Sequence, residues 1–338
     1  MISKLIPNKP GITLQEAYAN SENLRKWMDA EPIRHKWFQT ALRLEGLPRN
    51  ASTHAAGVVL SPVPLVDVVP IEQGHDDIYL TQWPMLEIEQ TGLLKIDFLG
   101  LRNLTILDQI RKSIQFTHQI ELQFNQIPLN DAKTFELLQR GDTVGIFQLE
   151  SDGMKNALRE IKPTHFLDIV AVNALYRPGP MQFIPVYASR KHKLESVVMP
   201  HPDLTPILQE TYGVIVYQEQ IMRIANVMAG FTIGEADLLR RAVSKKKREV
   251  LEQQRDAFVK GSLKKGYTKQ VAQEVYELIV RFADYGFPKS HAVAYSIISY
   301  QMAYLKANFP VNFYAALLTN ATGNSDKLMQ ILAEAKAN

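Results

Sequence analysis

The stretch Gly92-Leu-Leu-Lys-Ile-Asp-Phe-Leu-Gly-Leu-Arg102 carries one charged pair in an otherwise apolar segment. The alternation of a strand places Leu94 and Ile96 on one face, and Lys95 and Asp97 on the other. A carboxylate in such a segment is costly to bury unless a basic side chain or a metal ion binds it. Asp97 is therefore the best metal-ligand candidate, with an ion pair to Lys95 or an arginine as the alternative. Two-metal chemistry needs several converging carboxylates, and the sequence has no Asp-x-Asp to supply a strand-borne pair.

Length and composition limit the class of protein. The chain has 338 residues, enough for one large domain or for two to three ordinary ones. It contains no cysteine, which excludes disulfides, thiol nucleophiles and Cys-ligated zinc. No apolar run approaches the length of a membrane span, and the N-terminus has no secretory apolar core. We therefore expect a cytoplasmic protein with no membrane partner.

The pattern of residues predicts a helical piece, a small sheet and then a long helical domain. Thr13 and Glu16 have the spacing of a capping box, so we expect a helical stretch over residues 13–45. Between residues 53 and 98, short apolar runs alternate with prolines, which is typical of strands and turns. The fold class we expect is mainly α with a small β-sheet.

After Leu101, caps and amphipathic spacing predict a series of helices. Asn103, Asp131 and Ser290 are candidate N-caps, and Thr232 with Glu235 forms a second capping box. The expected helices are 103–114, 131–139, 164–176, 232–243, 249–265, 269–285 and 290–309.

The basic charge gathers in one segment, residues 240–265. Ten basic residues stand there against three acidic ones, although the net charge of the whole chain is only +3. The predicted function of this segment is to bind the phosphates of DNA, RNA or a nucleotide. The alternative is a solvated helix end, where lysines also favour the helix dipole. The residues that would meet phosphate are Arg240, Arg241, Lys245, Lys246 and Lys247.

A second candidate anion site lies at residues 287–295. Ser290 is the expected N-cap of a helix, with Lys289 before it and His291 just inside it. Free backbone N–H groups at a helix start attract anions. Tyr295 lies about one turn further along the same face, where it could stack on a base or sugar. A plain N-cap with a core tyrosine is the alternative.

Other polar residues carry weaker signals. Arg177 stands in a rigid Arg-Pro-Gly-Pro turn at a helix end, which suits phosphate recognition; a surface arginine is the alternative. His54 could be a base or a ligand, or a structural residue. The segments 145–150 and 216–220 mix apolar and amide residues, and we interpret them as packing and hydrogen-bonding elements.

Seven motifs stand in the order seen in the alpha subunit of bacterial DNA polymerase III, so the chain resembles this family of C-family replicative DNA polymerases. The absence of cysteine favours the shorter alpha-subunit type, since the longer type carries a zinc site. The motifs are residues 52–59, 92–101, 147–154, 174–180, 212–220, 239–247 and 287–295.

The resemblance implies a partial palm of the polymerase-beta-like nucleotidyltransferase fold, followed by a large helical fingers domain. It implies that residues 1–52 are the late thumb, 53–101 the second palm segment and 102–338 the fingers. In this family three aspartates hold two Mg²⁺ ions. The third lies in the motif matched at residues 95–100, which implies a catalytic and metal-binding role for Asp97. The first two come from a Pro-Asp-x-Asp-x-Asp-type motif that this sequence lacks.

The resemblance also implies substrates and partners. The fingers of the family bind the triphosphate of the incoming dNTP, so the substrates are dNTP and primer-template DNA. A sliding clamp and a clamp loader are expected partners of the complete polymerase, through regions that this sequence does not contain. The implied contacts to dNTP or phosphate are Arg177, Arg240, Arg241, Lys245, Lys246, Lys247, Lys289, Ser290 and His291, with Tyr295 as the contact to base or sugar.

The implied reaction is transfer of dNMP to a primer 3′-hydroxyl, with release of pyrophosphate, in bacterial chromosome replication. Because one aspartate cannot hold two metal ions, we expect this chain alone to be an inactive internal piece of a longer enzyme. One alternative is a non-catalytic helical module that binds nucleic acid, with Asp97 in an ordinary ion pair. Another is a catalytically dead piece that keeps the fingers fold.

Overall fold

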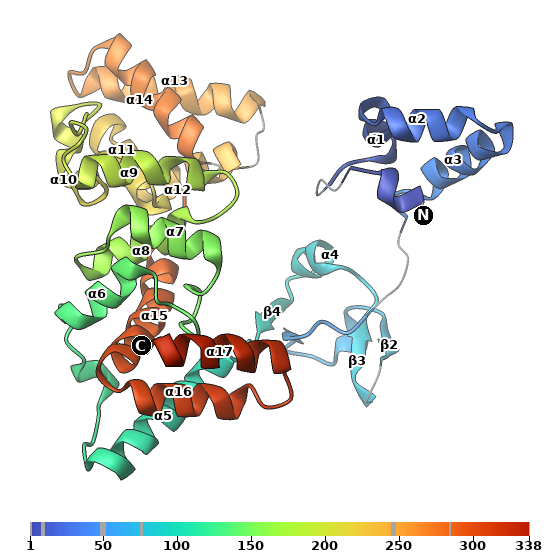
Figure 1. Ribbon diagram of the computed structural model, residues 1–338. Helices are drawn as coiled ribbons and strands as arrows, with labels where there is room; N and C mark the ends of the chain where they lie inside the picture. Colours follow the sequence, from blue (N-terminus) through green and yellow to red (C-terminus); the bar gives the residue numbers. More distant parts are fainter. Residues whose placement is uncertain are drawn as a thin grey trace. The chain divides into compact units, whose positions relative to one another are not determined.

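A computed structural model describes residues 2–7, 11–47, 52–74, 77–244, 248–283 and 285–337 of the chain. The chain divides at residue 100 into an N-terminal unit, Met1–Gly100, and a C-terminal unit, Leu101–Asn338 (Figure 1). The fold class expected from the sequence, mainly α with little β structure, is confirmed. Within the described ranges, none of the helices combines the length and hydropathy that crossing a bilayer requires.

The N-terminal unit begins with helices. The predicted capping box is confirmed, because Thr13 Oγ1 accepts the N–H of Glu16 at 3.1 Å and the Glu16 carboxylate accepts the N–H of Thr13 at 3.2 Å. The helical stretch over 13–45 is broken at Ser21, which ends one helix and caps the next, and at Pro32, which begins the third. The helices are α1 (Leu14–Asn20), α2 (Glu22–Asp29) and α3 (Pro32–Leu44).

The β structure of this unit forms two separate sheets, so the expectation of one small sheet is wrong. One sheet pairs β1 (Gly57–Leu60) with β4 (Leu94–Asp97), and the other pairs β2 (Ile71–Gln73) with β3 (Tyr79–Thr81), both antiparallel. Helix α4 (Met85–Gln90), which the sequence did not predict, lies between β3 and β4. Val69, Ile88 and Leu93 form the buried core of this part.

Among its described residues the C-terminal unit contains helices joined by turns and loops, without a named strand, and it has one large apolar core. Helix α15 packs against α5, α6, α8 and α16, while α11 packs against α12, α13 and α14 (Figure 1). The helices are α5 (Arg102–His118), α6 (Ala132–Arg140), α7 (Asp152–Ile161), α8 (Phe166–Leu175), α9 (Ile184–Lys191), α10 (Thr205–Leu208), α11 (Gln218–Ala229), α12 (Ile233–Ser244), α13 (Arg248–Lys264), α14 (Lys269–Ala283), α15 (Lys289–Asn308), α16 (Pro310–Asn320) and α17 (Ser325–Ala337).

The predicted caps of this unit are partly confirmed. Asp131 caps α6 by accepting the N–H of Thr134 at 2.9 Å, and Thr232 and Glu235 exchange hydrogen bonds before α12. Asn103 and Ser290 are not N-caps, because α5 and α15 begin earlier, with Leu101 and Pro288 at their N-caps. The expectation for these two residues is therefore wrong.

A close helix contact predicts the effect of one substitution. Gly261 of α13 lies against the end of α11, where an added Cβ would stand 2.2 Å from the carbonyl oxygen of Ala229. We expect Gly261→Ala to lower the free energy of unfolding by about 1–3 kcal/mol, because backbone must move to admit the methyl group. Urea unfolding of the purified chain, followed by far-UV circular dichroism, measures this loss.

Gly234 provides the matched control, because it is also helical and a Cβ there meets nothing within 4 Å. Gly234→Ala should leave stability unchanged or raise it slightly. Equal unfolding midpoints for the two variants would contradict the close contact at Gly261.

Candidate functional site

Asp97 ends strand β4 opposite Gly57 of β1. Its carboxylate is 55% exposed, and Oδ1 lies 2.9 Å from the ammonium of Lys95. The hydrogen bond from Lys95 lowers the pKa of Asp97 further below neutral pH, where an aspartate is already ionised. A Cβ on Gly57 would stand 2.5 Å from Lys95 Cε and 2.9 Å from Asp97 Oδ1. A side chain at position 57 would therefore displace this pair from its present position.

His54 takes part in the turn before β1. Its Nδ1 accepts the backbone N–H groups of Ala56 at 3.1 Å and Gly57 at 2.6 Å. These bonds give His54 a structural role in forming the turn that leads to the Lys95–Asp97 pair.

The N-terminal unit supplies one carboxylate at this position. In the part of the chain that the structure describes, no group of three His, Asp or Glu residues could hold a metal ion. The exposed, ionised oxygen atoms of Asp97 are ligands that Mg²⁺ accepts. By itself Asp97 does not fit a two-ion site, which needs further carboxylates.

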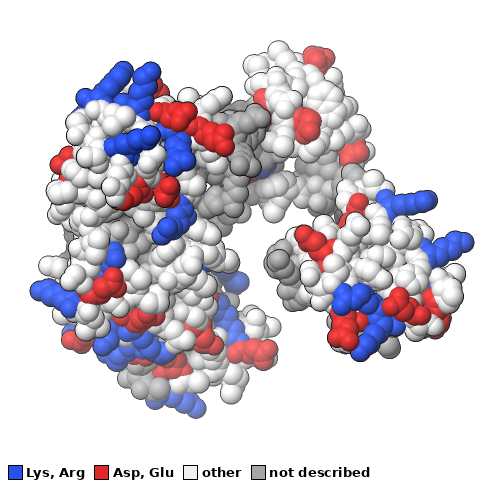
Figure 2. Space-filling model, turned by 90° about the horizontal axis from the view of Figure 1, so that it is seen from above, with Lys and Arg blue, Asp and Glu red and all other residues white. Residues whose placement is uncertain are grey.

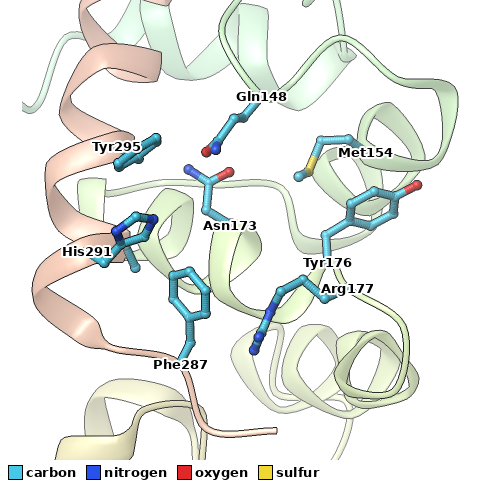
Figure 3. A pocket seen from close by; sticks show the side chains of 9 residues that line it. Gln148, Met154, Asn173, Tyr176, Arg177, Phe287, His291 and Tyr295 are labelled. Carbon is cyan, nitrogen blue, oxygen red and sulfur yellow. The ribbon is translucent and has the colours of Figure 1, made fainter. Parts of the chain in front are cut away.

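The C-terminal unit contains a cavity of about 250 Å³ between the loop before α7, the end of α8 and the start of α15 (Figure 3). Three predicted site residues come together here from distant parts of the sequence: Arg177, His291 and Tyr295. The side chains that line the cavity are Gln148, Met154, Asn173, Tyr176, Arg177, Phe287, His291, Ala292 and Tyr295.

Aromatic rings form one wall of the cavity. His291 and Tyr295 stack with ring centroids 4.3 Å apart and an interplanar angle of 25°. Phe287 meets His291 edge-on at 5.3 Å, and Phe147 lies 5.5 Å from Tyr295. The predicted placement of Tyr295 one turn beyond His291 on the same face is confirmed. These rings pack on one another and give the cavity an aromatic wall.

Arg177 is held in place by contacts to the surrounding protein. Its Nη2 donates to the carbonyl oxygen of Tyr285 at 2.7 Å, and its Nε donates to that of Ala174 at 2.9 Å. The guanidinium also lies 4.4 Å from the centroid of the Phe287 ring. Burial lowers the pKa of Arg177, but an arginine remains charged at neutral pH. Arg177 thus brings a fixed positive charge to the cavity.

Two amide side chains in the cavity were not predicted as site residues. Asn173 donates from Nδ2 to Ser296 Oγ at 2.8 Å. Its Oδ1 is buried and has no hydrogen-bond partner among the described residues. Gln148, with the positive φ of 61°, turns its side chain toward Asn173 (Figure 3). Gln148 lies in the segment 145–150, which we interpreted as a packing and hydrogen-bonding element, and in the family motif 147–154. Asn173 lies in neither of these segments.

The start of α15 is already occupied by two carboxylates. Glu219 accepts the backbone N–H of Lys289 with both oxygens at 3.0 Å. Glu210 accepts from the ammonium of Lys289 with both oxygens, at 2.8 and 2.7 Å. Ser290 is exposed, and neither it nor Lys289 lines the cavity. The prediction of a helix start with free N–H groups is therefore wrong at Lys289.

Arg240 and Arg241 of α12 share one carboxylate. Asp237 accepts from Arg240 through Oδ1 and from Arg241 through Oδ2, both at 2.7 Å. Arg240 also donates to Gln218 Oε1 at 3.2 Å, and Gln218 donates to the carbonyl oxygen of Gly286 at 3.1 Å. This chain of bonds links α12 to the turn before α15.

The remainder of the basic segment is only partly described. Lys245, Lys246 and Lys247 lie outside the described residues. Lys264 and Lys265 are exposed at and just after the end of α13. Figure 2 shows Lys and Arg interspersed with Asp and Glu over the face in view, without a single large basic field. The described surface therefore makes no continuous basic channel on that face.

Comparison with known families now gives these two units an identity. Residues 1–100 match the bacterial DNA polymerase III alpha NTPase domain, and residues 103–266 match the bacterial DNA polymerase III alpha subunit finger domain. The class defined by the two matches is that of bacterial DNA polymerases. The chain belongs to the DNA polymerase III alpha subunit family, which confirms the resemblance seen in the sequence.

Curated relatives agree with this assignment. The chain is 57% identical to DNA polymerase III subunit alpha of Bacillus subtilis (strain 168) and 56% identical to that of Halalkalibacterium halodurans, each over 335 residues. The subunit of Staphylococcus epidermidis is 52% identical. Each alignment covers 99% of this chain. The chain spans about 30% of the length of these relatives.

The fixed position of Arg177 can be tested by a conservative change. Lysine cannot reproduce the fork of donors that reaches Ala174 and Tyr285, nor the planar stack on Phe287. We expect Arg177→Lys to lower the free energy of unfolding by about 1–3 kcal/mol, measured by urea denaturation. Arg223→Lys, at an exposed arginine of α11, is the control and should change little. Equal effects would show that the contacts of Arg177 contribute nothing.

Proposed function

We propose that this chain forms part of the catalytic core of a DNA-directed DNA polymerase in bacterial chromosome replication. The reaction is attack of a primer 3′-hydroxyl on the α-phosphate of a dNTP, which transfers dNMP and releases pyrophosphate. The observation that carries the proposal is the exposed, ionised Asp97 at the end of β4, within residues 1–100 that match a polymerase domain.

The proposed domain assignment follows the family. Residues 1–52 belong to the late thumb, 53–101 to the second palm segment of polymerase-beta-like fold and 102–338 to the fingers. The division of the fold after Gly100 and the start of the finger-domain match at residue 103 support the last boundary.

Asp97 is the proposed ligand of Mg²⁺, together with carboxylates from elsewhere in the polymerase. Bound Mg²⁺ would lower the pKa of the primer hydroxyl and neutralise charge on the phosphates. The role of this chain is to hold the Asp97 carboxylate ionised and exposed at a strand end. Lys95 holds the carboxylate in position through their ion pair, and Gly57 leaves room for the pair.

The proposed dNTP contacts lie in the C-terminal unit. The rings of His291 and Tyr295 give a stacking surface for the base or sugar. Fixed positive charges stabilise phosphate oxygens most effectively when no reorganisation is needed, and Arg177 is held in this way. The remaining phosphate contacts are assigned to Arg240, Arg241, Lys245, Lys246, Lys247, Lys289 and Ser290.

The proposed partners are primer-template DNA and the incoming dNTP. In the complete polymerase, a sliding clamp and a clamp loader are further partners, and the proposed location is the cytoplasm. Family membership supports these assignments.

The role of Asp97 can be tested in a polymerase that carries this sequence. Asp97→Asn keeps the shape of the side chain but removes its charge, so Mg²⁺-dependent primer extension should fall by at least about a thousandfold if the ligand is essential. Binding of primer-template DNA should change little. The control is Asp108→Asn, at a surface aspartate of α5 paired with Arg111 and Lys112. Near-normal extension by the Asp97 variant would favour a non-catalytic module in which Asp97 forms an ordinary ion pair.

The basic segment makes a separate prediction about salt. If Lys245, Lys246 and Lys247 bind DNA phosphates, replacing them with alanine should flatten the slope of log affinity against log salt by roughly 0.9 for each phosphate left without its lysine. Fluorescence anisotropy with labelled primer-template, over a range of salt concentrations, measures the slope for the purified chain and its triple-alanine variant. A matched triple change at exposed lysines outside the segment should leave the slope nearly unchanged. These control lysines are Lys112, Lys133 and Lys327.

If the triple variant of residues 245–247 shows an unchanged slope, these lysines do not bind DNA phosphates and the segment is a solvated helix end.

A further inference from the structure

The start of α15 carries more acid than base. The ammonium of Lys289 meets both oxygens of Glu210, and the backbone N–H of the same residue meets both oxygens of Glu219. Two carboxylates therefore stand against one ammonium, and this small cluster has a net charge of −1. The net negative charge of this cluster would repel an incoming polyphosphate unless one of the two carboxylates moved away from Lys289.

The two carboxylates are held differently. Glu219 lies in the first turn of α11, where a negative charge favours the helix dipole, and it satisfies a main-chain N–H that would otherwise lack a partner. Glu210 lies in the short 3₁₀ segment Gln209–Thr211, and its hydrogen-bond partner among the described residues is a side chain, that of Lys289. Moving Glu210 away from Lys289 therefore costs less free energy than moving Glu219.

The pair between Lys289 and Glu210 is accessible to solvent. The side chains are 31% and 28% exposed, and pairs of this kind contribute little to stability. The ammonium of Lys289 also lies 5.3 Å from the centroid of the buried Tyr217 ring. That contact needs no carboxylate, so Lys289 keeps one of its present neighbours when Glu210 moves away.

We propose that Glu210 is an internal competitor of the triphosphate for Lys289: its carboxylate holds the ammonium in the absence of nucleotide and is replaced by a phosphate when nucleotide binds. The proposal rests on the proposed function, since it takes Lys289 as a phosphate contact. It adds that the Glu210 carboxylate occupies Lys289 before nucleotide binds, so the free energy of nucleotide binding includes the cost of displacing Glu210. No bond is made or broken in this exchange.

The test uses the purified chain and tripolyphosphate, which has the phosphates but neither base nor sugar. Isothermal titration calorimetry compares the wild-type chain with Glu210→Gln, which keeps the shape of the side chain and removes its charge. Loss of the competitor should tighten binding by about fivefold, the scale of a partly exposed ion pair. Weaker or unchanged binding, or no binding by either protein, would overturn the proposal.

Two further variants identify the cause of any change. Glu195→Gln removes a surface carboxylate that pairs with Arg190 Nε at 3.0 Å elsewhere in the same unit, and it should not tighten binding. In a Lys289→Gln background, Glu210→Gln should produce no gain, because the competitor acts through Lys289. A gain that persists without Lys289 would overturn the proposal. If Glu210→Gln does not fold by circular dichroism, Glu210→Ala replaces it in the same comparison.

Nucleotide kinetics separate this proposal from the proposed function. In a polymerase that carries this sequence, Lys289→Gln should raise the KM for dNTP, and Glu210→Gln should lower it, with kcat less affected in both cases. If tripolyphosphate binding responds to Glu210 but the KM for dNTP responds to neither change, the competitor exists and the dNTP role of Lys289 fails. If Lys289→Gln raises KM while Glu210→Gln changes neither measurement, the dNTP role stands and the competitor fails.

Discussion

A short backbone pairing between residues 216–218 and Phe287 determines the arrangement of the C-terminal site. The N–H of Phe287 donates to the carbonyl oxygen of Val216, and the N–H of Gln218 donates to the carbonyl oxygen of Phe287, both at 3.0 Å. This parallel bridge fixes Tyr217, the residue before α11, beside Phe287, which stands two residues before α15. Because α11 and α15 begin on either side of it, their first turns have a defined register.

The other contacts of the site follow from that register. Glu219 comes directly after the bridge and reaches the N–H of Lys289. Gln218 joins Gly286 to Arg240. The Phe287 ring meets Arg177 on one side and His291 on the other. One pair of main-chain hydrogen bonds thus holds the turn before α15. Charged residues from α12, from α15 and from the turn after α8 gather around it.

The buried side chain of Gln220 keeps the bridge in place. Its Oε1 accepts the N–H groups of Val216 and Tyr217 at 2.8 and 3.0 Å, and its Nε2 donates to Thr211 Oγ1 at 2.8 Å. A buried amide with all these partners orders the segment, whereas an unpaired one would cost free energy. The interpretation of residues 216–220 as a hydrogen-bonding element is confirmed. The same segment also supplies Glu219, whose carboxylate accepts the N–H of Lys289 at the start of α15.

The sequence predicted the interactions that lie within a few residues of each other. The caps formed by Thr13 with Glu16 and by Thr232 with Glu235 were predicted because donor and acceptor stand three residues apart. The N-cap prediction for Ser290 was wrong because α15 begins at Lys289, whose N–H is accepted by the Glu219 carboxylate 70 residues away in the sequence. Such a partner has no local signature.

Long-range contacts also explain the residues that the sequence left out or misjudged. Arg177 was predicted as a phosphate contact on a rigid turn, but nothing near it in the sequence shows that Tyr285 and Phe287 would receive its guanidinium. Asn173 was missed because only the fold brings it into the same cavity as His291 and Tyr295. Its Oδ1 is buried there without a hydrogen-bond partner among the described residues. The family motifs indicated most of the residues of the candidate site. The contacts between those residues could be seen only in the folded structure.

Asp97 shows how the two interpretations of one residue can be reconciled. Strand alternation placed Lys95 and Asp97 on one face, and the structure joins them at 2.9 Å. The ion pair uses Oδ1, while the side chain stays 55% exposed. Lys95 also lowers the pKa of this carboxylate. A metal ion at Asp97 would share the carboxylate with the ammonium of Lys95 or displace it, because both cations are drawn to the same negative charge. The exposed part of the side chain leaves room for such a second cation, so the ion pair and the proposed metal-binding role are compatible.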